Sequence, residues 1–194
     1  MSNVDFKNMI GGQLLMILCV IFYLTWWCIR FKPGGFETTF SMICLGCAFV
    51  SGLAGIFFNC HGIRTAGGDA RAVFGLSNTN ILIGCVILYF LLFAVLTFAV
   101  HRTLTTELLL IVGWLALELC TINQLCAINA FCGGVTIAFA LITIAVSIAS
   151  LACYLAYYKV TAVQGWIVGM IPLIIIGLTM SAVCAISWFT VHPK

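Results

Sequence analysis

Glu118 is the residue whose type and position point most directly to chemistry. It lies near the middle of an apolar stretch at residues 107–128. A charge at the centre of a bilayer costs roughly 2.5–3.5 kcal/mol on insertion scales, so such residues normally face a bundle interior. No Lys or Arg lies inside an apolar stretch to pair with it. We therefore expect a buried carboxyl at the membrane midplane that binds a proton or a cationic or hydrogen-bonding solute.

The neighbours of Glu118 add polar groups and an aromatic ring. Trp114 and Thr121 lie at the i−4 and i+3 positions of a helix, and Asn123 and Gln124 follow towards the same end. A ring beside a few convergent polar groups is typical of a small-molecule site. We predict that all five residues bind the solute. The alternative is a protonated carboxyl bonded to a neighbouring helix, with amides that end the helix and shape its turn.

Two further residues are predicted to gate access. His61 follows the apolar stretch 38–60, and an imidazole can change charge near neutral pH. Pro172 lies inside the stretch 163–190, where its missing N–H favours a kink. The alternatives are an interfacial histidine held by Asn59 and loop backbone, and a kink that only relieves packing.

The cysteines and histidines give little support for a cofactor. Nearly all of the 11 cysteines lie in apolar stretches, where a thiol packs as a small hydrophobic group. Cys44 and Cys47 form the only closely spaced pair on a short motif, and they would share a helix face. His61 and His101 end different stretches on opposite membrane sides, and His192 lies in the C-terminal tail. We expect no haem, no metal and no other cofactor.

The composition decides which elements position these residues. Of 194 residues, 64% are hydrophobic and 7% charged, whereas soluble domains are about 45–50% apolar and about 25% charged. This excludes a soluble domain, a nucleic-acid-binding protein and a secreted disulfide scaffold. A membrane-crossing helix needs about 20 apolar residues. The sequence therefore predicts an all-α, polytopic membrane protein, a six-transmembrane-helix bundle that forms one domain over residues 1–194. Its predicted spans are residues 10–29, 38–60, 79–100, 107–128, 133–157 and 163–190.

Neither orientation nor oligomeric state follows from the sequence. Cytoplasmic loops are normally richer in Lys and Arg, but here each side carries four, which leaves one fixed orientation or a dual topology open. The two sets are Lys7, Arg64, Arg71 and Lys194, and Arg30, Lys32, Arg102 and Lys159. Small residues at i and i+4, such as Gly165 and Gly169, let helices approach closely, either within one chain or in a homo-oligomer.

The leading hypothesis is a small-solute channel or secondary transporter with Glu118 as its proton or substrate site. This hypothesis assigns no enzymatic activity to the protein. Expected partners are membrane lipids and a small polar or cationic solute or a proton, with no nucleic acid. One alternative is an intramembrane redox enzyme acting on a lipid or quinone through Cys44 and Cys47, or through Glu118 with His61. Another is an accessory membrane subunit whose Gly- and Ala-rich faces bind a partner.

Overall fold

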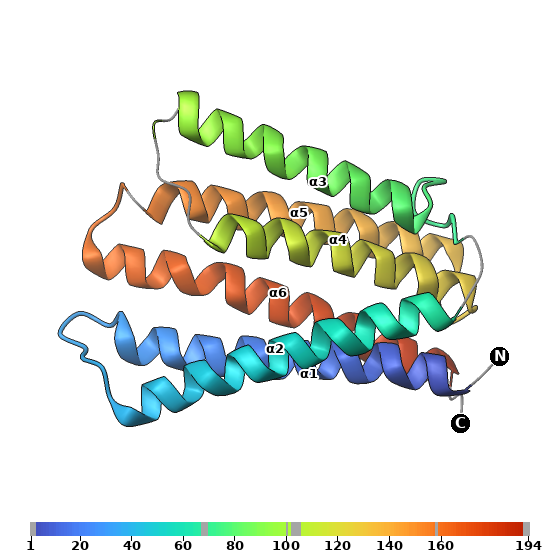
Figure 1. Ribbon diagram of the computed structural model, residues 1–194, viewed down its shortest axis with the longest axis horizontal. Helices are drawn as coiled ribbons and strands as arrows, with labels where there is room; N and C mark the ends of the chain where they lie inside the picture. Colours follow the sequence, from blue (N-terminus) through green and yellow to red (C-terminus); the bar gives the residue numbers. More distant parts are fainter. Residues whose placement is uncertain (1–2, 67–69, 100, 102–105, 158, 192–194) are drawn as a thin grey trace. The chain divides into compact units, whose positions relative to one another are not determined.

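The fold is all-α. The computed structural model describes residues 3–66, 70–99, 101, 106–157 and 159–191. A single π-helical turn, η1, continues the third helix (Figure 1). The elements are α1 (Asn3–Arg30), α2 (Thr39–Thr65), α3 (Asn78–Ala94), η1 (Val95–Ala99), α4 (Thr106–Ala127), α5 (Gly133–Tyr157) and α6 (Ala162–Val191).

Five predicted spans each coincide with one α-helix and the span 79–100 with α3 and η1, its last residue lying outside the described residues, so the predicted fold class is confirmed. The ends differ where polar residues dilute the apolar stretch. α1 begins at Asn3, ahead of the predicted start, and α2 continues past residue 60 to Thr65. Among the residues added to α2, Gly62 continues the buried face that Gly55 and Asn59 belong to. Packing against a neighbour therefore extends the helix beyond the point at which its sequence turns polar.

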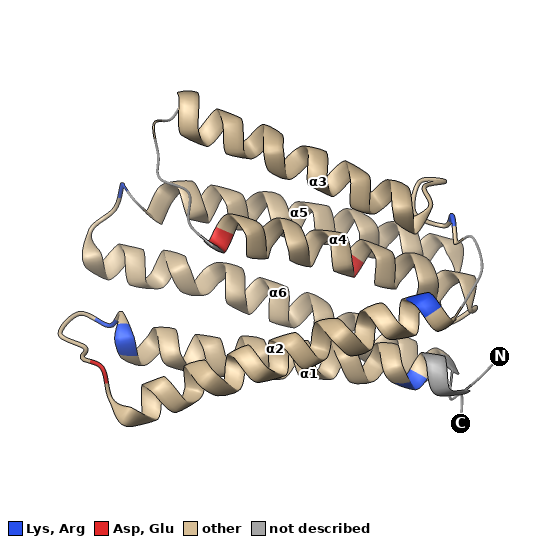
Figure 2. Ribbon diagram, viewed as in Figure 1, with Lys and Arg blue, Asp and Glu red and all other residues tan. Residues whose placement is uncertain are grey.

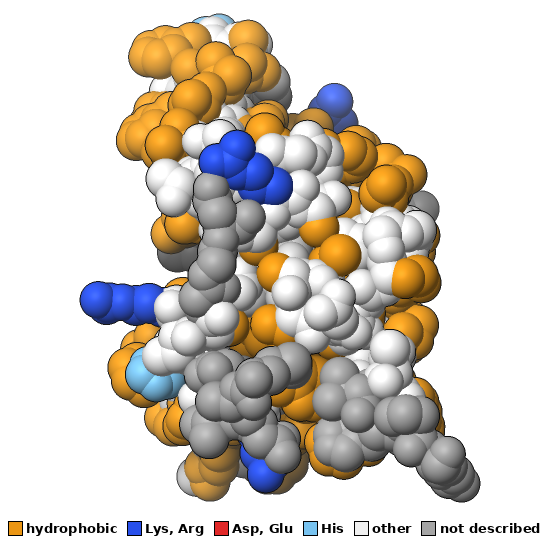
Figure 3. Space-filling view, turned by 90° about the vertical axis from the view of Figure 1, so that its right-hand side faces the viewer, with side chains coloured by type: hydrophobic (Ala, Val, Ile, Leu, Met, Phe, Trp, Pro, Cys, Tyr) orange, Lys and Arg blue, Asp and Glu red, His pale blue; other side chains and the backbone are white. Residues whose placement is uncertain are grey.

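All six helices are long and apolar enough to cross a membrane, with spans of 21 to 29 residues. At 1.5 Å per residue the shortest covers about 32 Å, close to the thickness of the hydrocarbon core. Many large hydrophobic side chains are exposed, and the face shown in Figure 3 carries hydrophobic side chains beside a few Lys and Arg. Apart from acidic positions in α4, charged residues lie near helix ends or in connections (Figure 2). These features suggest a multi-pass membrane protein. Arg102, Lys194 and His192 lie outside the described residues.

The chain divides into two compact units, Met1–Gly67 with Ala152–Lys194, and Gly68–Leu151. In the first, α1 and α2 pack closely through glycine. A Cβ added at Gly12 would lie 2.6 Å from the backbone nitrogen of Asn59, and one added at Gly55 would lie 3.0 Å from the carbonyl oxygen of Gly12. Only glycine allows so close an approach of the two backbones.

In the same unit α1 also packs against α6. The Trp27 ring lies directly against Gly169, leaving no space for a Cβ. The indole Nε1 of Trp27 donates to the carbonyl oxygen of Trp166 at 3.1 Å. Gly169, one half of the Gly165/Gly169 pair, is thus used for packing within the chain. A homo-oligomer stays a prediction.

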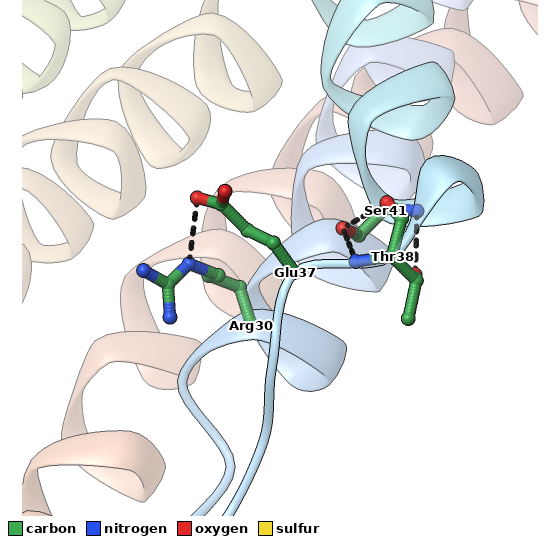
Figure 4. A network of polar contacts seen from close by, with 4 residues as sticks. All are labelled: Arg30, Glu37, Thr38 and Ser41. Carbon is green, nitrogen blue, oxygen red and sulfur yellow. Dashed lines mark hydrogen bonds and ion pairs between the residues drawn. The ribbon is translucent and has the colours of Figure 1, made fainter.

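The start of α2 is fixed by a capping box (Figure 4). The Ser41 backbone N–H donates to Thr38 Oγ1, and the Thr38 N–H donates to Ser41 Oγ, each at 3.1 Å. These bonds satisfy backbone donors that a helix start leaves open. Just before the cap, Arg30 Nε lies 3.0 Å from Glu37 Oε1, an ion pair between exposed side chains.

The unit Gly68–Leu151 holds α3, α4 and most of α5. Its central feature is the burial of α4. In the most apolar window of α4, 78% of residues are buried, against 17–33% in the other five helices. Leu109, Leu110 and Gly113 near the start of α4 are exposed, whereas the polar side chains from Glu118 to Gln124 are buried. The expected single domain stays a prediction.

Candidate functional site

Glu118 is buried in the middle of α4, with 1% of its surface exposed. The helix carries a second carboxyl, Glu107, in its first turn. The two share one helix face with Trp114 and Thr121, because the positions are separated by steps of seven, four and three residues. The carboxyls are separated by three helical turns, about 16 Å along the axis. Glu107 was not predicted as a site residue from the sequence, because it lies at the end of a predicted span.

Asn123 holds the segment that leads into α3. Its Oδ1 accepts hydrogen bonds from the backbone N–H groups of Ala72 and Val73 at 2.7 and 3.0 Å. Its Nδ2 donates to the carbonyl oxygen of Ala70 at 2.8 Å and to Asn78 Oδ1 at 2.7 Å. We call Asn123 with residues 70–78 the amide hub. Both ends of the side chain are occupied by protein groups, so Asn123 positions the hub.

Gln124 joins the hub from the next position of α4. Its Oε1 accepts a hydrogen bond from Asn78 Nδ2 at 3.2 Å. Thr121, one turn earlier, donates to the carbonyl oxygen of Leu117 in its own helix at 2.8 Å. The predicted set is therefore all on α4 and all buried, but its amides are engaged by the start of α3. Their predicted role as solute ligands stays a prediction.

Trp114 differs from these residues. The indole is 5% exposed, yet within the described ranges its Nε1 has no hydrogen-bond partner. A buried indole N–H normally finds one. Trp114 and Glu118 lie one helical turn apart on the same face. Thr121 shares this face, whereas Asn123 and Gln124 bind residues of the amide hub.

A row of hydroxyls on α5 belongs to the same unit. Thr143, Ser147 and Ser150 are buried and share one helix face, since they are spaced by four and three residues. None of the three hydroxyls has a hydrogen-bond partner among the residues that the structure describes. We call them the hydroxyl row. Sequence reasoning missed them, and their heptad-like spacing in an otherwise apolar stretch was the available signal.

The connection 128–132 sets the level of these residues along the two helices. Within it the Ala130 N–H donates to the carbonyl oxygen of Leu125 at 2.8 Å, and the Phe131 ring stacks on Phe139 at 5.5 Å between centroids. A short connection makes α4 and α5 antiparallel (Figure 1). Counted equally from the connection, Thr143 lies near the level of Glu118. The hydroxyl row then continues towards the end at which α4 begins.

The two predicted gating residues belong to the other compact unit. His61 is exposed near the end of α2, with its ring stacked on Phe57 at 6.1 Å between centroids. α6 continues through Pro172 as one helix from Ala162 to Val191. Their gating role stays a prediction.

The cysteine pair lies in that unit as well. Cys44 is buried and Cys47 half-buried, and both thiols are free. Cys44 shares the small-residue face of α2 with Gly52 and Gly55, whose added Cβ atoms would meet Cys19 and Met16 of α1. In the described part of the chain, no group of three His, Cys, Asp or Glu could hold a metal ion. The redox alternative stays a prediction.

Comparison of the chain with protein-family models, with curated proteins and with solved structures found no match in any of the three.

Proposed function

We propose that the chain is a small-solute channel or secondary transporter in which Glu118 is the proton or substrate site. The observation that carries this proposal is a carboxyl with 1% exposure halfway along a helix of membrane-crossing length. Ionisable residues at that depth are costly and commonly mark solute or proton pathways.

The chemistry of a buried carboxyl suits exchange. An ionised carboxylate in apolar surroundings is strongly disfavoured unless a cation lies beside it. The group therefore holds either a proton or a cation, and it holds both together poorly. Exchange of one for the other would couple solute movement to proton movement. Without such exchange, the same carboxyl serves a passive channel as a hydrogen-bonding station.

The polar groups near Glu118 support a site for a small polar molecule. Trp114 offers an indole N–H one turn away on the same face, and its Nε1 has no partner in the described residues. Neutral donors beside a single carboxyl can bind a small cation or an uncharged amide-like solute. A lipid- or quinone-directed enzyme and an accessory subunit are the rival proposals, and no contact in the described residues favours them.

Reconstituted protein tests this proposal. Liposomes loaded with a pH-sensitive dye receive a potassium diffusion potential from valinomycin, with ammonium, urea or acetate added outside in separate runs. We expect Glu118→Gln to lower the rate of internal pH change by about tenfold or more, which corresponds to about 1.4 kcal/mol in the barrier. The matched control is Glu37→Gln, the same change at an exposed position, which should keep the wild-type rate. Unchanged proton and solute rates in Glu118→Gln would contradict the proposal.

A further inference from the structure

Polar atoms without partners gather in one half of the unit Gly68–Leu151. Among the described residues of this unit, they lie between the level of Glu118 and the end where η1 closes and α4 begins. The other half, around Asn123 and Gln124, is hydrogen-bonded to residues 70–78. The atoms are Thr97 Oγ1, Glu107 Oε2, Trp114 Nε1 and the hydroxyls of Thr143, Ser147 and Ser150.

The hydroxyl row differs from several other Ser and Thr residues of this chain, which donate to a carbonyl oxygen of their own helix. In α6 the buried Ser187 donates to the carbonyl oxygen of Val183 at 2.6 Å, and Thr179 donates to that of Ile175 at 2.8 Å. Thr136, one helical turn from the start of α5, makes the same bond to Cys132 at 3.0 Å. A buried hydroxyl left without a bond costs about 1–3 kcal/mol. Three successive hydroxyls lack such a bond to any described residue, which leaves them available to a small hydrogen-bonding partner such as water.

The spacing of the row fits water. Thr143 and Ser150 are separated by two helical turns, about 10 Å along the axis. Hydrogen-bonded oxygens lie about 2.8 Å apart, so a file of about four molecules would cover that distance. The lining groups are neutral and can each donate and accept, which suits water better than an ion. Buried waters typically bond otherwise unsatisfied polar groups.

We infer that the hydroxyl row binds a file of water that links the level of Glu118 to the membrane face at which α4 begins. The inference rests on the proposed function, because it supplies the access path of that carboxyl. Glu107 marks the outer end of the path, since it shares the face of Glu118 and stands in the first turn of α4. The amide hub closes the opposite end. Access to Glu118 is therefore from one side of the membrane.

Thiol labelling in liposomes tests the path. Ser147→Cys and Ser150→Cys are introduced separately into the full chain and treated with iodoacetamide, and mass spectrometry of peptides separates them from the native cysteines. A thiol forms its reactive thiolate where water reaches it and stays inert in a dry core. We expect both to react about tenfold faster than Ser187→Cys, a buried serine with a backbone bond, and Ser150→Cys to react faster than Ser147→Cys. Labelling no faster than at Ser187→Cys overturns the inference.

A second measurement needs no substitution. Trp114 and Trp27 are similarly buried, at 5% and 8% exposure, but only the indole of Trp27 has a protein partner in the described residues. Hydroxyl radicals generated from bound water should oxidise Trp114 severalfold faster than Trp27, and equal protection overturns the inference. Both measurements leave Glu118 unaltered. If Ser147→Cys and Ser150→Cys are labelled but Glu118→Gln keeps the wild-type rate of internal pH change, only the proposed function is refuted. If neither cysteine is labelled but Glu118→Gln loses that rate, only the water path is refuted.

Discussion

The two ends of the unit Gly68–Leu151 differ in whether their buried polar groups are hydrogen-bonded to the described residues. At one end both the oxygen and the nitrogen of the Asn123 amide are hydrogen-bonded to residues 70–78, and Gln124 binds Asn78. At the other end the hydroxyl row and the Trp114 indole are equally buried, yet none has a partner among the described residues. Both ends lie on helices of membrane-crossing length.

This difference separates two uses of polarity inside a membrane. A polar group satisfied by the protein fixes a structure, because breaking its bonds leaves buried donors and acceptors exposed to lipid or apolar side chains. A buried group with no protein partner is available for water or a solute. Hydrogen bonding, rather than residue type or burial, therefore tells a structural polar residue from a candidate binding residue.

The largest effect is expected at the centre of the amide hub. Asn123→Ala removes hydrogen bonds to the backbone groups of Ala70, Ala72 and Val73 together, and Ala70 and Val73 are buried. We expect a loss of about 3 kcal/mol in the free energy of unfolding. Denaturant unfolding in detergent, followed by circular dichroism, measures it, with the exposed Asn80→Ala as the control. A wild-type unfolding midpoint for Asn123→Ala would show that the hub is not structural.

A smaller effect is expected at the rim of the hub. Asn78→Ala removes one hydrogen bond to Asn123 and one to Gln124, but leaves the backbone bonds of Asn123 in place. We expect a loss of about 1–2 kcal/mol in unfolding free energy. The same unfolding assay gives the value. A loss as large as that of Asn123→Ala would show that Asn78, rather than Asn123, makes the main contribution of the hub to the free energy of unfolding.

The smallest effect on stability is expected in the hydroxyl row. Ser147→Ala removes a hydroxyl that bonds to no described residue, so unfolding free energy should stay within about 0.5 kcal/mol of wild type. Ser187→Ala, which loses a bond to Val183, should cost about 1 kcal/mol. Ser147→Val should slow proton flux severalfold because its methyl groups displace water. A clear destabilisation by Ser147→Ala would show that this hydroxyl stabilises the fold, as the amide hub does at the other end.

The helices were predictable because length and hydropathy alone define a membrane-crossing segment. Their ends were not, because α2 continues to Thr65 with Gly62 packed on its buried face, beyond the point at which its sequence turns polar. The burial of Glu118 was also predictable, since one carboxyl inside an apolar stretch has no other favourable place. The sequence carries no sign that Asn123 would bind a segment some fifty residues earlier. The hydroxyl row was missed because Ser and Thr commonly occur in apolar helices. Its spacing by four and three residues was visible in the sequence, but the missing hydrogen bonds to described residues were not.

Proton uptake by liposomes containing wild type, Glu118→Gln and Glu118→Asp, measured side by side, tests the central claim most directly. A carboxyl that exchanges its proton predicts fast uptake in wild type, partial recovery with Asp, and a rate near that of empty liposomes with Gln. Each variant must first show the wild-type helix content and elution volume. Equal rates for wild type and Glu118→Gln would contradict the account and assign the buried carboxyl to packing.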